Sequence, residues 1–199
     1  MSYAIIGFGS IGKALAKAYA RSGIEVSVAT TRDPASFAAD AAAIGPGIKP
    51  ATLAQAVEAD IIFLAVRFES YPDVARALSS WKGKTIIDVT NAYGVPPEEL
   101  GGQPSAKVVA RAFTGAKLVK GFNHLVAGVL EQDPAVHGGK RVVFLASDDD
   151  GAATEVATLA QKLGFAPVKL GGLSEGGLLV HARGNSWGQL IFKDLVKFD

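Results

Sequence analysis

Three glycines near the N-terminus, Gly7, Gly9 and Gly12, constrain the fold of this chain more than any other feature. They follow the apolar run of residues 3–6 and precede residues 13–20, which are typical of a helix. A strand, a glycine turn and a helix in this order form the context in which a G-x-G-x-x-G pattern indicates a dinucleotide site. The first glycine permits the tight turn, the second lets the backbone approach a pyrophosphate, and the third lets the helix pack closely on the strand.

The helix after the glycine turn supplies the rest of the predicted phosphate site. Its first N–H groups have no intrahelical acceptors and carry partial positive charge, so they attract anionic groups. We therefore expect the phosphates to lie over residues 7–12, with Ser10 and Ile11 among the contacts. The alternative is a glycine-rich turn that binds no ligand, which is uncommon in this context.

The second predicted strand, residues 24–29, indicates which nucleotide binds, because it ends in Thr30, Thr31 and Arg32. NAD-selective chains carry Asp or Glu near this point to hold the ribose 2′-hydroxyl, whereas Arg presents a planar fork of donors to a 2′-phosphate. The sequence therefore favours NADP over NAD. Asp33 is interpreted as the N-cap of a helix over residues 34–44. The alternative for Arg32 is an ordinary solvated surface charge.

Composition excludes several classes of function. The chain has 199 residues, 49% of them hydrophobic, a formal net charge of +1 and no cysteine. The charge gives no support for nucleic acid or a membrane surface as a partner. Without cysteine there is no disulfide, thiolate nucleophile or iron–sulfur cluster. No apolar run approaches a membrane span and no signal peptide is recognisable, so a cytoplasmic location is expected.

Alternating strand and helix patterns continue along the chain and predict a doubly wound α/β fold of the Rossmann type. Further strands are expected at residues 48–51, 60–66, 84–89, 117–122, 141–146 and 165–170, and helices at 53–58, 72–79, 105–113, 125–132, 152–163 and 174–182. This gives a mainly parallel sheet of about eight strands. We expect a single domain over residues 1–199, with a core at 1–140 and a βαβ extension and tail at 141–199. Residues 187–198 fit a helix or a strand equally well.

Ligands of open parallel sheets bind outside the carboxyl ends of the strands, near the point where the strand order reverses. Besides the glycine turn, this rule selects three later loops as cofactor contacts. They contain Ala65, Val66 and Arg67, then Asn91 and Ala92, and then Asn123 and His124. The nicotinamide end should lie among them.

The polar residues of these loops each have two interpretations. Asn91 and Asn123 either bind a carboxamide or ribose hydroxyl, or form turns at strand ends. Arg67 either meets an anionic ligand or is a surface charge. His124 is the candidate catalytic residue, because an imidazole can hydrogen-bond a flavin ring or move a proton near neutral pH; otherwise it caps the following helix.

The other histidines and the acidic run are interpreted as structural. His137 precedes two glycines in a turn, and His181 lies in a predicted C-terminal helix, and neither has a metal-ligand partner four residues on. The three aspartates at 148–150 are typical of a solvated helix start. No metal site is predicted.

The chain resembles the coenzyme F420-dependent NADP oxidoreductases and the related cytoplasmic reductase domain of six-transmembrane metalloreductases. The resemblance spans nearly the whole chain and rests on residues 7–12, 31–32, 88–91, 119–123, 164–165 and 171–174. It implies NADP(H) across the sheet and a flavin or deazaflavin such as F420 stacked on the nicotinamide. Arg67 stands where such loops commonly carry proline. The C-terminal segment, which helps to form the acceptor site and the dimer contact in the family, is short here.

These observations predict an NADP(H)-dependent oxidoreductase that transfers a hydride between NADPH and a planar flavin-type or deazaflavin-type acceptor. The redox chemistry would belong to the cofactors, while the protein orients them and excludes water. A homodimer through the tail is expected. The alternative is an NADP(H)-binding protein without turnover, which senses redox state or serves as a subunit.

Overall fold

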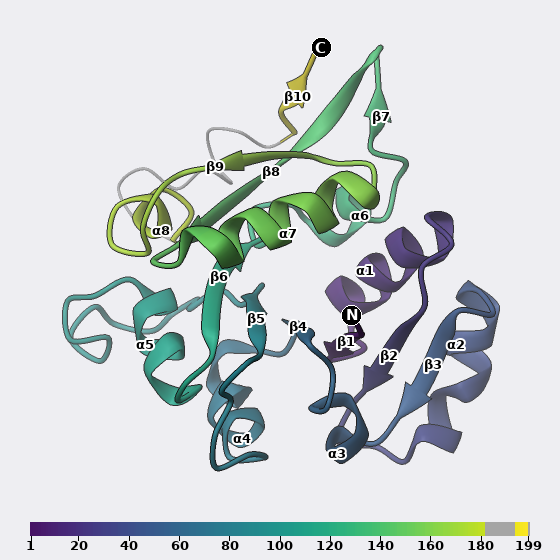
Figure 1. Cartoon of the computed structure of the whole chain (residues 1–199), viewed down its shortest axis with the longest axis horizontal. Coiled ribbons are helices and arrows are strands. Elements are labelled where there is room, and N and C mark those ends of the chain that lie inside the picture. Colours follow the sequence, from purple (N-terminus) through teal and green to yellow (C-terminus); the bar gives the residue numbers. More distant parts are fainter. Residues whose placement is uncertain (182–193, 199) are drawn as a thin grey trace.

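The computed structural model describes residues 1–181 and 194–198, in which a single twisted sheet is covered by helices on both faces (Figure 1). The strands are β1 Tyr3–Ile6, β2 Val26–Ala29, β3 Ile48–Ala51, β4 Ile61–Leu64, β5 Thr85–Asp88, β6 Lys117–Gly121, β7 Ala135–Val136, β8 Gly139–Ser147, β9 Ala166–Lys169 and β10 Val196–Lys197. The α-helices are α1 Ser10–Arg21, α2 Ala38–Ile44, α3 Leu53–Ala56, α4 Tyr71–Ala75, α5 Ser105–Ala112, α6 Ala127–Leu130, α7 Asp150–Lys162 and α8 Gly176–Leu179. Two 3₁₀ helices, η1 Pro34–Phe37 and η2 Phe68–Ser70, precede α2 and α4.

The first six strands are parallel and lie in the order β3-β2-β1-β4-β5-β6. This is the strand order of the doubly wound dinucleotide-binding fold, so the predicted fold class is confirmed. The strand order reverses between β1 and β4, because β2 and β3 lie on one side of β1, whereas β4, β5 and β6 lie on its other side. The described residues contain ten strands instead of about eight. The two additions, β7 and β10, are two-residue ladders on β8 that carry no clear pattern in the sequence.

The last unit of the sheet, β8-α7-β9, extends the same sheet as expected, but β8 runs antiparallel to β6. A tight hairpin causes this reversal. His137 and Gly138 join β7 to β8, with φ of +49° and +84°. Two central residues with positive φ define the hairpin turn whose twist matches that of the flanking strands. In Figure 1 this unit forms the upper part of the molecule, with α7 lying across the sheet.

Two apolar clusters, one on each face, hold the helices to the sheet. Side chains alternate along the central strands: Ile5 and Phe63 face one cluster, whereas Ile62 and Leu64 face the other. Helices α1, α2, α6 and α7 pack on the first cluster, and α3, α4 and α5 pack on the second.

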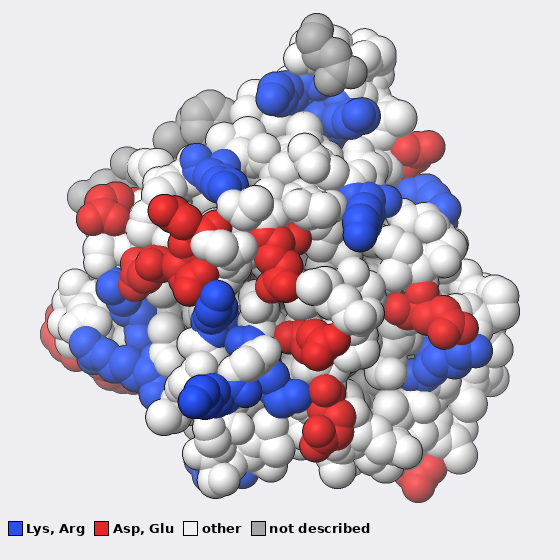
Figure 2. Space-filling view, viewed as in Figure 1, with Lys and Arg blue, Asp and Glu red and all other residues white. Residues whose placement is uncertain are grey.

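Figure 2 shows acidic side chains gathered near the start of α7 and basic side chains beside them over α5. Two ion pairs, Lys107–Asp148 and Lys117–Asp149, cross this border.

The helix starts agree with the sequence interpretation at several points. Asp33 accepts a hydrogen bond from the Ala35 N–H and so caps η1, and Asp149 accepts from the Ala152 N–H at the start of α7. The tail assignment is resolved only in part. The strand β10 lies within the ambiguous segment 187–198, whereas residues 187–193 of that segment lie outside the described residues.

Candidate functional site

The glycine turn has the geometry that a bound pyrophosphate requires. Gly7 has φ of +110°, and a Cβ added there would lie 2.2 Å from the Ala65 carbonyl oxygen. A Cβ at Gly12 would lie 1.9 Å from the Gly7 carbonyl oxygen, so only glycine lets α1 pack this closely on the turn. A Cβ at Gly9 would meet nothing within 4 Å. The turn therefore leaves open space at Gly9, directly before the first N–H groups of α1.

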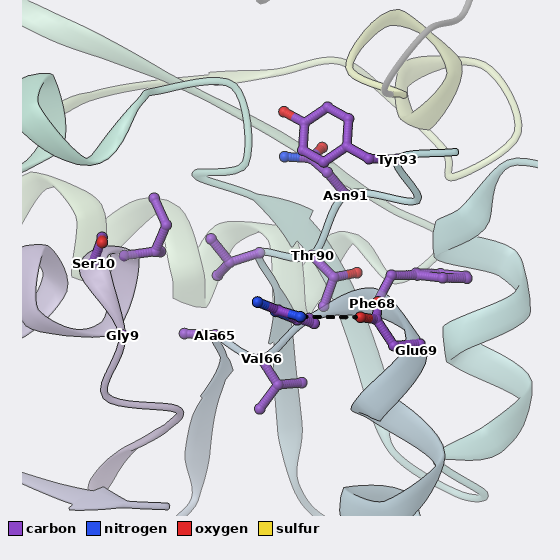
Figure 3. A pocket seen from close by; sticks show the side chains of 12 residues that line it. Gly9, Ser10, Ala65, Val66, Phe68, Glu69, Thr90, Asn91 and Tyr93 are labelled. Atoms are coloured by element: carbon purple, nitrogen blue, oxygen red, sulfur yellow. Dashed lines mark ion pairs between the residues drawn. The ribbon is translucent and has the colours of Figure 1, made fainter. Parts of the chain in front are cut away.

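A cavity of about 580 Å³ lies where the sheet order reverses (Figure 3). Three loops line it, one after each of β1, β4 and β5. They contribute Gly9, Ser10 and Ile11, then residues 65–69, and then Val89, Thr90, Asn91 and Tyr93. In Figure 3, Ser10 lies across the hollow from Thr90, and Tyr93 stands at its upper rim above Asn91. The volume is in the range of small-molecule sites, and the place is the one expected from the strand order.

A second cavity of about 340 Å³ adjoins the first on the side of β2. Its lining includes Thr30 and Thr31 from the end of β2, Gly7 and Gly9 from the turn, and Leu53 and Val74 from α3 and α4. Gly9, Ala65, Val66 and Arg67 line both cavities. The Arg67 side chain is 86% exposed and lies 3.9 Å from the Glu69 carboxylate. The two cavities thus form one elongated site over the ends of β1 and β4.

Arg32 follows Thr31 in the chain, is not among the residues that line this second cavity, and packs its guanidinium on an aromatic ring. Its guanidinium lies 5.5 Å from the centroid of Phe37, and its backbone N–H donates to the Thr30 hydroxyl. Asp33, the carboxylate next to Arg32, accepts from the Ala35 N–H and caps η1, as interpreted from the sequence. The end of β2 therefore carries two hydroxyls and a guanidinium, while the adjacent carboxylate is engaged by the backbone.

The loops after β5 and β6 are joined by a pair of amide side chains. Asn91 Nδ2 donates to the Asn123 carbonyl oxygen at 2.9 Å, and Asn123 Nδ2 donates to Asn91 Oδ1 at 2.9 Å. The residue before Asn123 is Phe122, which is fully buried and has φ of +61°, a value that bulky residues rarely adopt. This turn of the backbone brings Asn123 to Asn91. Ala92, which was expected to contact the cofactor, packs instead in the apolar cluster beneath the loop and is 3% exposed.

A buried ion pair lies directly under these loops. Lys120 Nζ is 3.1 Å from Asp88 Oδ2 and also donates to the Thr90 carbonyl oxygen, and both charged side chains are at most 1% exposed. Asp88 Oδ1 accepts from the N–H and the hydroxyl of Thr90. Burial lowers the pKa of the Lys120 ammonium, and the Asp88 carboxylate opposes that shift. The pair therefore fixes the backbone of the loop that lines the larger cavity.

Sequence reasoning missed the role of this ion pair, although the sequence contains a signal for it. Asp88 and Lys120 are opposite charges at the carboxyl ends of two consecutive strands, each directly after two apolar residues. They are also direct partners in the register of β5 and β6. Charges in buried strands are seldom tolerated unless they are paired, so two of them in neighbouring strands predict a pair.

His124 does not lie where a catalytic residue would need to be. It is 1% exposed, its ring centroid lies 4.8 Å from that of Phe144, its Nε2 lies 3.2 Å from the Val142 carbonyl oxygen, and it is not among the residues that line either cavity. Burial lowers its pKa to about 4, so the ring is neutral near pH 7. The geometry therefore corrects the expectation that His124 faces the acceptor, because the strand β8 covers it.

Comparisons with known proteins find relatives among reductases. The model of the family "NADP oxidoreductase coenzyme F420-dependent" matches residues 2–92, which include the glycine turn and the loops after β4 and β5. The metalloreductase STEAP3 of Rattus norvegicus is 30% identical over 173 residues, which are 85% of this chain and 34% of the relative. STEAP2 of Mus musculus is 35% identical over 58% of this chain and 22% of the relative. The chain thus spans about a third or less of the length of these curated relatives.

Two solved structures resemble most of the chain. A hypothetical protein, SMa0349 from Sinorhizobium meliloti, is 38% identical with a TM-score of 0.91 and covers 99% of this chain and 96% of its own. A putative F420-dependent NADP-reductase from Arthrobacter sp. FB24 is 29% identical with a TM-score of 0.69 and covers 87% and 86%.

The fold is of the Rossmann type, and the matching family model and the solved neighbours are those of NADP-dependent oxidoreductases. The family model covers just under half of the chain, and the resemblance to the coenzyme F420-dependent NADP oxidoreductases that the sequence indicates is confirmed over that part. Among the described residues, no helix is long and apolar enough to cross a membrane. The same part of the chain contains no group of three or more His, Asp or Glu side chains that could hold a metal ion.

Proposed function

We propose that this chain binds NADPH along the two joined cavities and transfers a hydride between its nicotinamide and a planar flavin-type or deazaflavin-type acceptor. The observation that carries the proposal is the continuous site over the ends of β1 and β4, with open space at Gly9 and the N-terminus of α1 beside it. Bound NADPH would supply the hydride. The protein would bind the phosphates, orient the two rings and exclude water.

The cavity over β2 suits the adenosine end of NADPH. It is lined mainly by apolar atoms and by Thr31, and Arg32 follows Thr31 in the chain and packs its guanidinium on Phe37. A 2′-phosphate there would meet hydroxyls and a planar guanidinium, which binds phosphate oxygens as a fork of donors. Arg67 lines both cavities and is free to reach the pyrophosphate between them, since its contact with Glu69 is long and exposed. Such exposed pairs contribute little energy and exchange readily.

The larger cavity suits the nicotinamide and the acceptor. Its far wall consists of Thr90, Asn91 and Tyr93, which the Lys120–Asp88 pair and the Asn91–Asn123 amide pair hold in place. Asn91 and Asn123 are therefore proposed to orient the nicotinamide end. The hydride step needs no strong acid, so the burial of His124 is compatible with this function.

Steady-state NADPH oxidation tests the proposal. We expect the wild-type chain to oxidise NADPH with riboflavin or 5-deazariboflavin as acceptor and to lose this activity in Gly9→Val, whose side chain would fill the space at the turn. Absence of turnover in the wild type with both acceptors, despite NADPH binding in calorimetry, would favour an NADP(H)-binding protein without turnover.

The proposal also includes the organisation of the chain. A single NADP-binding domain over residues 1–199, a cytoplasmic location and a homodimer remain expectations from the sequence. The uninterrupted sheet from β3 to β9 supports the first of these. Light scattering during size-exclusion chromatography measures the mass of the particle and would test the dimer.

A further inference from the structure

His181, interpreted from the sequence as structural, lies beside the acceptor end of the proposed site. The carbonyl oxygen of the preceding residue, Val180, accepts a hydrogen bond of 2.7 Å from Asn123 Nδ2. The same nitrogen donates to Asn91 Oδ1 at 2.9 Å, and Asn91 lines the larger cavity. One amide group therefore separates the backbone at residue 180 from the cavity rim. Figure 3 shows the ribbon of α8, which ends just before Val180, above Tyr93.

The imidazole of His181 is held in one orientation by Ser105. The Ser105 backbone N–H donates to His181 Nδ1 at 3.3 Å, and the Ser105 hydroxyl lies 3.2 Å from the same nitrogen. Ser105 is 2% exposed and begins α5, so its position is fixed by the fold. Because Nδ1 accepts a hydrogen bond, it carries no proton. The neutral ring then has its proton on Nε2, which makes Nε2 a hydrogen-bond donor.

The surroundings keep this ring neutral near pH 7. Burial lowers the pKa of His181, and the positive charge of Lys120 lowers it further. Lys120 is the cation that donates to the Thr90 carbonyl oxygen beneath the larger cavity. His181 is thus close enough to Lys120 for the two groups to interact electrostatically. The residue is half-buried.

We propose that His181 is a binding residue for the electron acceptor, and that its Nε2–H donates a hydrogen bond to the pyrimidine part of a flavin-type or deazaflavin-type ring. This inference rests on the proposed function and adds to it the residue that recognises the acceptor. The pyrimidine carbonyl oxygens of such rings only accept hydrogen bonds, so their recognition requires donors. When the ring takes up a hydride from NADPH, the added negative charge spreads over these oxygens. A nearby N–H stabilises that charge without giving up its proton.

Two substitutions separate recognition from packing. We expect His181→Ala to raise the KM for riboflavin and 5-deazariboflavin about tenfold, the usual effect of losing one such hydrogen bond. The Kd for NADPH should stay within about twofold of the wild type. His181→Gln should restore most of the affinity, because a glutamine can accept from Ser105 and still present an N–H donor. His137→Asn, in the exposed hairpin turn, is the control and should change neither constant.

Two outcomes of these kinetic and stability measurements would overturn the inference. One is NADPH oxidation by His181→Ala with an unchanged KM for both acceptors. The other is an equal loss of NADPH affinity and thermal stability in the Ala and Gln variants, which would indicate a packing role. Fluorescence titration of 5-deazariboflavin into the NADP⁺-loaded protein measures acceptor binding without turnover. Equal binding by wild type and His181→Ala would also overturn the inference, whereas weaker binding by the variant together with an inactive wild type would refute only the proposed hydride transfer.

Discussion

At the ends of β1 and β2 the site is made of backbone groups and small side chains, whereas at the ends of β5 and β6 it is made of buried polar side chains. The first region, the proposed phosphate end, contains glycines because its N–H groups must come close to the phosphates. In the second region, the proposed acceptor end, an ion pair and an amide pair hold the loop that lines the larger cavity. The difference indicates that the proposed phosphate end is specified by local sequence and the proposed acceptor end by contacts between segments distant in sequence.

The largest effect is expected at the acceptor end, from Lys120→Met. This variant leaves the Asp88 carboxylate fully buried without its cation, which should cost about 3–5 kcal/mol of unfolding free energy. Urea unfolding measures the loss. The double variant Asp88→Asn with Lys120→Met should recover most of it, because an asparagine still accepts from Thr90 and carries no charge.

An exposed pair in the same site provides the control for this substitution. Glu69→Gln removes the contact with Arg67, in which both partners are largely exposed, and should change stability by less than about 1 kcal/mol. If Lys120→Met changed the free energy of unfolding as little as Glu69→Gln, the buried pair would not hold the loop. The proposed difference between the two regions would then be wrong.

At the phosphate end, two glycines of one turn should respond differently. Gly12→Ala places a Cβ 1.9 Å from the Gly7 carbonyl oxygen and should cost about 3 kcal/mol of stability, measured by urea unfolding. Gly9→Ala adds a Cβ in open space and should leave stability within about 0.5 kcal/mol. It should nevertheless weaken NADPH binding about tenfold, since the added methyl group takes room beside the pyrophosphate. Equal losses of stability in the two variants would contradict the assigned roles.

Arg32→Ala should act on binding and not on folding. Losing hydrogen bonds to a charged phosphate should weaken NADPH binding by about 1.5–3 kcal/mol in calorimetry, while NADH binding stays nearly the same. Arg111→Ala, at an exposed position of α5, is the matched control and should affect neither nucleotide. An equal affinity of the wild type for NADPH and NADH would refute the assignment of Thr31 and Arg32 to the 2′-phosphate.

The last prediction concerns His124, whose effect appears only on acidification. Its pKa is about 4 in the folded protein, below the ordinary value near 6.5, so the unfolded chain binds the proton more readily. The stability that the neutral ring contributes is present above pH 6.5 and is lost as pH falls toward 4. Between pH 7 and 5 the loss should be about 2 kcal/mol, and His124→Phe should flatten this part of the pH profile of urea unfolding. An unchanged profile in the variant would show that another group titrates.

Much of the fold follows from local signals in the sequence. The glycine turn, the Asp33 and Asp149 caps and the parallel strands up to β6 depend on residues that are close neighbours in the chain. The direction of β8 was not predictable in the same way, because it depends on a two-residue hairpin with a histidine at positive φ. Nothing in the composition of His137 and Gly138 distinguishes such a hairpin from other turns.

The candidate site was also predictable only in part. The loops that line the cavities were identified because every parallel strand ends at one edge of the sheet. The environments of the two histidines were not, since His124 packs against β8 and His181 accepts a hydrogen bond from Ser105 at the start of α5. Val142 lies 18 residues from His124 and Ser105 lies 76 residues from His181, so no local pattern reports these contacts.

The conformation of Phe122 limits which substitutions this protein can accommodate. Its backbone conformation suits glycine, whereas its ring fills the core between Phe63 and Phe165, at 5.3 and 5.8 Å between centroids. A glycine there would relax the backbone but leave a hole in the core, and any other side chain would keep the strain. No residue satisfies both demands, so this position locks the path of the chain into Asn123. Substitutions are therefore more readily accommodated at the exposed Tyr93, which lines the larger cavity, than at Phe122.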